Sequence, residues 1–163
     1  QLEQDIRIYE TQNKTGNRFL DTILMTKSVH CQNAGIKLTC VANGHALDFM
    51  DVMDLSSLFG NALDNAIEAA SQLEDPEQRL IRLSVSYQKG FLCIWIENRC
   101  RETLTVAKGI PFTSKKDTRY HGFGVKSIYK TAEKYGGTAS VHAENGWFEL
   151  RVLIPREEVD TAK

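Results

Sequence analysis

The spacing of apolar positions changes along the chain between a helical period and a strand period. Apolar residues recur three or four positions apart in three main segments, as they do on the buried side of a helix. This spacing predicts helices over 18–32, from Asp51 or Asp54 to about 73, and over 123–135. Weaker helical spacing over 1–12 stops at Thr15-Gly16-Asn17.

Alternating apolar and polar residues predict the strands. We predict strands over 36–42, 80–87, 91–97, 139–143 and 147–154, where the third begins with a short continuous apolar run instead of an alternation. Gln88-Lys89-Gly90 and Glu144-Asn145-Gly146 predict two tight hairpins. We place Trp95 and Trp147, both in strands, in the core. The fold expected is α/β, a two-layer sandwich whose mixed, mainly antiparallel sheet is covered on one face by helices 54–73 and 123–135.

Composition narrows the class of protein further. The chain has 163 residues, 42% hydrophobic and 25% charged, which is ordinary for one globular domain. A net charge of −1 without a long block of like charge argues against nucleic acid or an anionic membrane surface as the main partner. The apolar run 91–96 is too short to span a bilayer.

The cysteines and the first residue bear on cellular context. The four cysteines form no CxxC pair, which favours reduced thiols inside a cell. The chain opens on Gln1 within a helical pattern, so we expect it to be a piece of a longer protein.

The segment from Gly60 to Ala70 carries the strongest chemical signal. Asn61, Asp64, Asn65 and Glu68 interrupt an Ala- and Leu-rich helix at offsets of three and four, which places them along one stripe. Asn carboxamides lower helix propensity and need partners if they are buried. The stripe could hold a hydrated divalent cation beside a nucleotide phosphate, with Asn65 offering its carboxamide oxygen to Mg²⁺. For two Asn residues in isolation, a solvated helix face is the favoured alternative.

A second signal is Gly122-Phe123-Gly124 at the start of a helix. Free N–H groups at a helix start bind anions, and glycine lets the backbone approach a phosphate closely. The motif alone is weak, because a plain loop would look the same. It is neither a dinucleotide fingerprint, since position 127 is Ser, nor part of a Walker motif.

A third signal is the long segment 98–121, in which periodicity fades and polar residues dominate. Long segments of this kind in a compact domain are usually functional or mobile. Lys115 and Lys116 could close over a triphosphate as a lid, and His121 lies next to the glycine turn. A solvated basic loop is the alternative.

The order of these signals resembles the GHKL (Bergerat) ATP-binding fold of histidine kinases, type II topoisomerases, Hsp90 and MutL, over about 36–155. Asn61-x-x-x-Asn65 resembles the N box, Phe112-Thr113-Ser114-Lys115 a lid motif, and Gly122-Phe123-Gly124-Val125 the second glycine box. LDNAIEAA, FTSKKD and HGFGVKSI are most similar to the AgrC-like, peptide-responsive sensor kinases of Gram-positive bacteria.

The residue type at the position of Asn61 differs between the hydrolytic members of the superfamily and this chain. Topoisomerases, Hsp90 and MutL carry at this position a glutamate that acts as general base. A carboxamide cannot take up the proton, so base-assisted hydrolysis loses its catalyst. A neutral histidine acceptor is itself nucleophilic and needs less help. The resemblance therefore favours a histidine kinase over a GHKL ATPase, with Asn61 as a catalytic and cofactor-binding residue.

The chain departs from most histidine kinases at two positions. Asn98 occupies the place of the Asp that accepts a hydrogen bond from the adenine amino group, and a neutral oxygen accepts that bond more weakly. The AgrC-like group tolerates this change. Glu68 stands where many histidine kinases have a basic residue. A degenerate scaffold without kinase activity is therefore a further alternative.

The resemblance also implies a domain plan and partners. Residues 1–34 would be the C-terminal part of a helical dimerisation region, 35–155 the ATP-binding catalytic domain, and 156–163 a flexible tail. The parent would be a membrane-anchored sensor kinase with a cytoplasmic catalytic part, homodimeric through its N-terminal helices. Its phosphoacceptor histidine would lie upstream of Gln1, and the phosphate would pass to a response regulator. The cofactors implied are ATP and Mg²⁺, with the cofactor contacts at Asn61, Asn65, Asn98, Lys115, His121, Gly122, Phe123, Gly124 and Val125.

Overall fold

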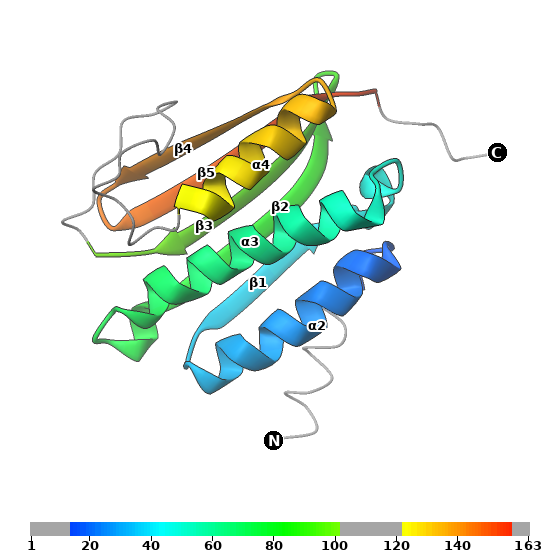
Figure 1. Ribbon diagram of the computed structural model, residues 1–163. Coiled ribbons are helices and arrows are strands. Elements are labelled where there is room, and N and C mark those ends of the chain that lie inside the picture. Colours follow the sequence, from blue (N-terminus) through cyan, green and yellow to red (C-terminus); the bar gives the residue numbers. More distant parts are fainter. Residues whose placement is uncertain (1–13, 102–121, 158–163) are drawn as a thin grey trace.

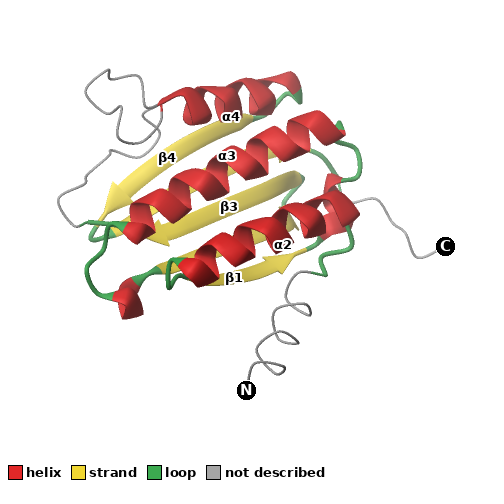
Figure 2. Cartoon of the chain, turned by 60° about the horizontal axis from the view of Figure 1, so that its bottom comes forward, coloured by secondary structure: helices red, strands yellow, loops and turns green. Residues whose placement is uncertain are grey.

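A five-stranded sheet carries three helices on one of its faces (Figures 1 and 2). The computed structural model describes residues 14–101 and 122–157. The helices are α2 (Arg18–Asn33), α3 (Val52–Ser71) and α4 (Gly122–Lys134). The strands are β1 (Lys37–Ala42), β2 (Leu80–Gln88), β3 (Phe91–Arg99), β4 (Thr138–Glu144) and β5 (Trp147–Pro155). Two 3₁₀ turns, η1 (Gly44–Leu47) and η2 (Pro76–Gln78), flank α3.

The sheet is mixed and mainly antiparallel, as the sequence predicts. Its strand order is β1-β2-β3-β5-β4, and only β1 and β2 run parallel. That parallel pair is joined through α3, the kind of crossover a parallel connection requires. The two predicted hairpins are present, with positive φ at both loop residues, Lys89-Gly90 and Asn145-Gly146. This turn geometry matches the twist of the flanking strands.

The core lies between the helices and the sheet. One face of each strand is apolar, and it meets the buried side of α3, whose Leu55, Phe59 and Leu63 are buried. The helix α2 shares this core, because its Leu20 and Leu24 belong to the same cluster of buried residues. The structure thus adds a third helix to the two expected on the sheet. The assignment of 1–34 to a dimerisation region stays a prediction.

Side-chain hydrogen bonds cap the start of α2, at the break that the sequence predicts over Thr15-Gly16-Asn17. Asn17 caps the helix, accepting from the N–H groups of Phe19 and Leu20, and its Nδ2 donates to Asp48 Oδ1 at 3.0 Å. Thr15 Oγ1 lies 2.8 Å from Asp21 Oδ1. The two bonds that Asn17 accepts satisfy N–H donors that a helix start leaves unpaired, and the other two tie the cap to Asp48 and Asp21.

Both tryptophans were predicted to be core residues, and this was wrong. The period of two places Trp95 and Trp147 on the sheet face that none of the described helices covers, and Trp95 is 37% exposed. Arginine guanidinium groups cover both rings there. Arg151 lies 4.4 Å from the Trp95 centroid, and Arg82 and Arg99 lie 5.0 and 5.1 Å from that of Trp147.

Three further features bear on the sequence predictions: the start of the predicted tail, the state of the cysteines and the length of the helices. Arg156, the first residue of the predicted tail, is held in place: its N–H donates to Gly90 O at 2.9 Å and its guanidinium lies 3.9 Å from the Phe49 ring centroid. All four cysteines are free, and burial raises the pKa of Cys31 and Cys40 to about 11. No helix in the described part of the chain is both long and apolar enough to cross a membrane.

Candidate functional site

The site is built by two antiparallel helices, α3 and α4, on the covered face of the sheet (Figure 1). Asp54, in the first turn of α3, contacts Lys134, the last residue of α4, and Tyr135, which follows it. One turn further along α3, Ser57 contacts Ser127 of α4, with the two Oγ atoms 3.1 Å apart. As the residue number rises along α3, that of its partner in α4 falls.

This register places the start of α4 beside the predicted Asn residues. Asn61 lies one turn beyond Ser57, and Phe123 lies one turn before Ser127. Since a turn advances both helices by about 5.4 Å, Asn61 faces the first turn of α4. Asn65 lies one turn further along α3, on the same side of the helix. The Ser57–Ser127 contact therefore pairs the Asn-bearing side of α3 with the helix that begins at the glycine turn, about sixty residues away in the sequence.

The start of α4 has the properties of an anion site. Its first four N–H groups, those of Gly122 to Val125, have no acceptor within the helix. No acidic residue lies in its first turn, and Lys134 lies in its last. The helix dipole thus favours an anion at Gly122, without a carboxylate to compete for it. The Val125 side chain is buried in the core, so only its backbone N–H is available to a ligand.

The polar stripe of α3 divides between two neighbours, which corrects the expectation that its four members share one site. Asn61 Nδ2 donates to Ser57 Oγ at 3.3 Å, toward α4. Asp64 turns toward α2, where its Oδ1 accepts from Lys27 Nζ at 2.6 Å. A residue three positions along a helix is rotated by about 60°, which is enough to reach a different neighbour. Asp64 therefore serves helix packing.

Asn65 and Glu68 complete the stripe. Asn65 is half-buried, and its carboxamide makes no hydrogen bond with another described residue. Glu68 is exposed on the same helix. Of the four, Asn61 is the one whose hydrogen bond leads toward α4, through Ser57, and Asn65 lies one turn beyond it on the same side of α3.

Asn98 lies on the covered side of the sheet at the end of β3. It is 1% exposed, and its Nδ2 donates to the Arg99 carbonyl oxygen at 3.0 Å. Because the amide nitrogen is engaged, the carbonyl oxygen is the end of this group that can accept a bond from a ligand. In Figure 1 the end of β3 and the start of α4 lie toward the same end of the molecule.

Two predicted contacts, Lys115 and His121, lie outside the described residues. Sequence reasoning missed four residues that set the geometry of the helix pair: Asp54, Ser57, Ser127 and Tyr135. Ser57 and Asn61 at positions i and i+4 were a visible local signal, since such a pair meets on a helix surface. The contacts with α4 carry no local signal, because their partners are seventy or more residues away.

The site would hold a metal through amide oxygens. Within the described part of the chain, no cluster of three His, Cys, Asp or Glu side chains could ligate an ion. Mg²⁺ needs few protein ligands, because it keeps several waters and shares its remaining positions with substrate phosphates. Two carboxamides beside an anion-binding helix start fit that requirement.

Comparison with known proteins identifies the family. The family model of the GHKL domain matches residues 50–155, which is well over half of the chain. This protein therefore belongs to the GHKL domain family, as the sequence motifs predicted. No curated protein sequence matches it.

Solved structures of histidine kinases share the fold. The catalytic domain of the histidine kinase ThkA, in a nucleotide-free form, matches with a TM-score of 0.66 and 16% identity over 87% of this chain and 95% of that one. Acinetobacter baumannii histidine kinase AdeS matches with a TM-score of 0.60 and 11% identity, covering 86% of this chain and 64% of AdeS.

A third structure, full-length ShkA in complex with AMPPNP, matches with a TM-score of 0.65 and 16% identity. The match covers 86% of this chain but 30% of ShkA. At these identities the likeness establishes the α/β sandwich fold. This chain spans less than two thirds of AdeS and of ShkA, so the activities of those longer proteins do not transfer with the fold.

Proposed function

We propose that this chain is the ATP-binding catalytic domain of a sensor histidine kinase of the AgrC-like group. The observation that supports the proposal is the antiparallel pairing of α3 and α4, in which Ser57, one turn before Asn61, contacts Ser127, about one turn after the start of α4. Triphosphate and a divalent cation need a helix start and amide oxygens at one place. The GHKL family match and the kinase neighbours support the same assignment.

Each residue then has a task in ATP binding. The N–H groups of Gly122, Phe123, Gly124 and Val125 donate to phosphate oxygens. The carbonyl oxygen of the buried Asn98 accepts from the adenine amino group. Asn65, with Asn61 next to it, offers an amide oxygen to Mg²⁺, which neutralises phosphate charge when bound. Lys115 and His121 are proposed as phosphate contacts from the sequence motifs.

The chemistry proposed is transfer of the γ-phosphoryl group to a histidine nitrogen, with ADP as the leaving group. Asn61 stands where hydrolytic relatives have a basic glutamate, and a carboxamide does not take up a proton. The acceptor imidazole attacks in its neutral form, so the domain contributes positioning and charge neutralisation. We propose that the acceptor lies upstream, in the dimerisation region of a homodimeric, membrane-anchored parent, and that a response regulator receives the phosphate.

Ligand-induced thermal stabilisation tests the binding step. We expect Mg-ATP to raise the melting temperature of the chain, because a ligand of the native state adds about 2.7 kcal/mol at a hundred times its Kd. Asn65→Ala should remove the Mg²⁺-dependent part of the shift. The control is Gln72→Ala, an exposed carboxamide at the end of the same helix. An Asn65→Ala protein with a full shift would refute the metal role, and a wild type without any shift would favour the scaffold alternative.

Phosphate release and labelling separate kinase from ATPase. We expect this chain, given Mg-ATP labelled at the γ-phosphate, to release no phosphate above the buffer rate and to take up no label. Of its described histidines, His45 and His142 are paired with Asp48 and Glu144, and His30 is exposed on α2. Steady phosphate release would establish the ATPase alternative instead, and label on the chain would place the acceptor within it.

A further inference from the structure

One polar contact between α3 and α4 joins Ser57 and Ser127, which lie outside both the N box and the second glycine box. Ser57 Oγ lies 3.1 Å from Ser127 Oγ and accepts from Asn61 Nδ2 at 3.3 Å. All three side chains are half-buried. The hydroxyl of Ser57 therefore links Asn61 on its own helix to the helix that begins with the glycine turn.

We propose that Ser57 and Ser127 are positioning residues for the Mg-ATP site, acting through Asn61. This inference rests on the proposed function. Two consequences of the contacts carry it, one for the orientation of the Asn61 amide and one for the spacing of the two helices.

The first consequence concerns which end of the amide a ligand meets. A carboxamide offers a donor nitrogen on one side and an acceptor oxygen on the other. When Ser57 accepts from Nδ2, the amide oxygen is the end left for a cation or its bound water, and oxygen is what Mg²⁺ binds. Without the hydroxyl, the amide can turn over and present its NH₂ group, which repels a cation.

The second consequence concerns the distance between the two halves of the site. Ser127 lies one turn after the start of α4, and Ser57 one turn before Asn61. A hydrogen bond between the hydroxyls fixes the register of the helices within one turn of the site. The Asp54 contacts with Lys134 and Tyr135 fix it at the far end, one turn before Ser57 on α3 and about two turns after Ser127 on α4. The start of α4 is thereby held opposite Asn61.

A plain helix-packing role would predict a different result. Ser71 provides the matched control, because it is a half-buried serine of α3 whose hydroxyl donates only within its own helix, to Ile67 O at 2.6 Å. If Ser57 only packs, Ser57→Ala and Ser71→Ala should both change thermal stability slightly and leave nucleotide affinity alone.

Calorimetric titration with Mg-ATP, and with ATP in EDTA, tests the inference. We expect Ser57→Ala to weaken Mg-ATP binding about three- to ten-fold, the effect of one hydrogen bond, and to change affinity for metal-free ATP less than two-fold. Ser57→Thr, which keeps the hydroxyl, should restore affinity. The double variant Ser57→Ala/Ser127→Ala should bind no more weakly than Ser57→Ala alone, since both remove the same link.

The side-chain resonance of Asn61 gives a readout that needs no nucleotide. In the free protein, Ser57→Ala should shift the Asn61 NH₂ signals and speed their exchange with solvent, and Ser71→Ala should leave them in place. Unchanged signals and unchanged Mg-ATP affinity in Ser57→Ala would overturn the inference while the proposed function stands. A wild type that fails to bind Mg-ATP would overturn both.

Discussion

Neighbouring polar residues of one helix serve different purposes in this protein. Asn61 and Asp64 are three positions apart, yet the first bonds toward α4 and the second toward α2. Their sequence spacing suggested one ligand-facing stripe. The side chains follow the partners within reach instead, a lysine for the carboxylate and a serine for the amide.

Glycines illustrate the same dependence on surroundings. A Cβ on Gly137 would overlap the carbonyl oxygen of Leu153 and lie 2.9 Å from Ile154 Cα, whereas a Cβ on Gly60, within α3, would meet no described atom within 4 Å. We expect Gly137→Ala to lower the free energy of unfolding by about 2–3 kcal/mol, because backbone has to move. Gly60→Ala should raise it by about 0.5–1 kcal/mol through helix propensity.

Urea denaturation of the two glycine variants measures both effects. Equal free energies of unfolding for Gly137→Ala and wild type would contradict the close approach of β5 to the turn between α4 and β4. A destabilised Gly60→Ala would show that space beside α3 is needed there.

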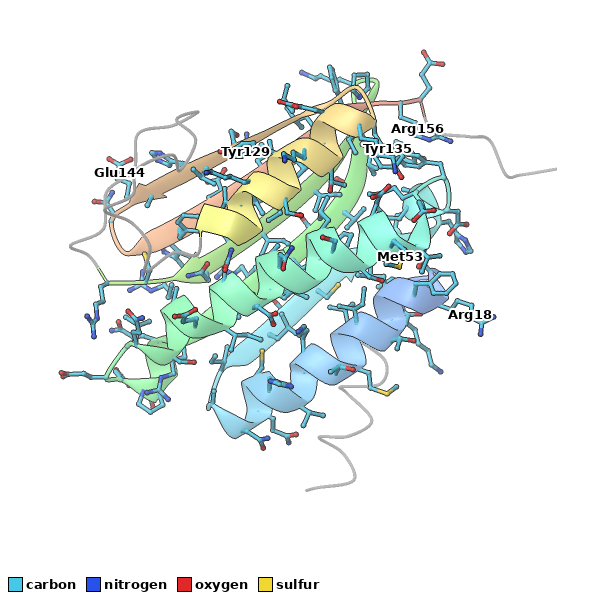
Figure 3. The ribbon with its side chains drawn as sticks, in the orientation of Figure 1. Arg18, Met53, Tyr129, Tyr135, Glu144 and Arg156 are labelled. Carbon is cyan, nitrogen blue, oxygen red and sulfur yellow. The ribbon has the colours of Figure 1, made fainter. Side chains whose placement is uncertain are left out.

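At the scale of elements, one cluster joins the start of α3 to the end of α4. Asp54 Oδ2 accepts from Lys134 Nζ and from the Tyr135 hydroxyl, each at 2.6 Å, and the Asp51 N–H donates to that hydroxyl at 2.9 Å. Figure 3 shows Tyr135 at this end of the molecule, near Arg156. The Tyr135 ring packs edge-on against Phe49.

The same cluster makes stability depend on pH. The hydrogen bonds from Lys134 and Tyr135 lower the pKa of Asp54 below its ordinary 3.8, and the hydrogen bond with Asp54 raises the pKa of Lys134 above 10.5. A lowered carboxyl pKa in the folded state stabilises above the unfolded pKa and is lost as pH falls through the folded one. A raised Lys pKa stabilises below 10.5 and is lost above it. The contribution is therefore complete at neutral pH and disappears in acid.

Denaturation of Asp54→Asn between pH 7 and pH 2 tests this linkage. We expect the variant to be less stable than wild type at pH 7, with a difference that shrinks below about pH 4 as Asp54 of the wild type becomes protonated. The control is Glu133→Gln, which removes a charge from an exposed residue of α4. A difference that stays constant down to pH 2 would contradict the assignment.

At the scale of the whole molecule, the three helices of the described segments lie on one face of the sheet, and the other face is stabilised by its own side chains. There the arginines over Trp95 and Trp147 join ion pairs between Arg82 and Glu97 and between Arg151 and Glu149. These contacts, across strands for Arg82–Glu97 and Arg151–Trp95 and within β5 for Arg151–Glu149, replace the apolar burial that a second helical layer would provide.

Replacement of Trp147 tests this account of the open face. We expect Trp147→Ala to lower the free energy of unfolding by about 1–2 kcal/mol, because two cation–π contacts are lost. Trp147→Phe should retain part of that energy, and Mg-ATP affinity should not change, since the ring lies on the face opposite the helices. A Trp147→Ala protein as stable as wild type would show that the arginine contacts contribute nothing.

The spacing of apolar residues was enough to predict the helices and strands. Burial of one side requires apolar residues every second position in a strand and every third or fourth position in a helix. The strand pairs at Lys89-Gly90 and Asn145-Gly146 were predictable because tight hairpins need residues that tolerate positive φ. The Asn and glycine motifs likewise indicated the GHKL family that the comparison identified.

Only the tertiary structure decided which partners these side chains meet. The sequence could not place Trp95 on the open face, because alternation marks two faces without saying which one the helices cover. Nor could the sequence predict that Asn61 and Asp64 bond toward different helices, or that Ser57 contacts Ser127. Hydrogen bonds between distant segments depend on how the helices are aligned in the fold. A local pattern limits what a segment can become, and packing between segments then selects the contacts it makes.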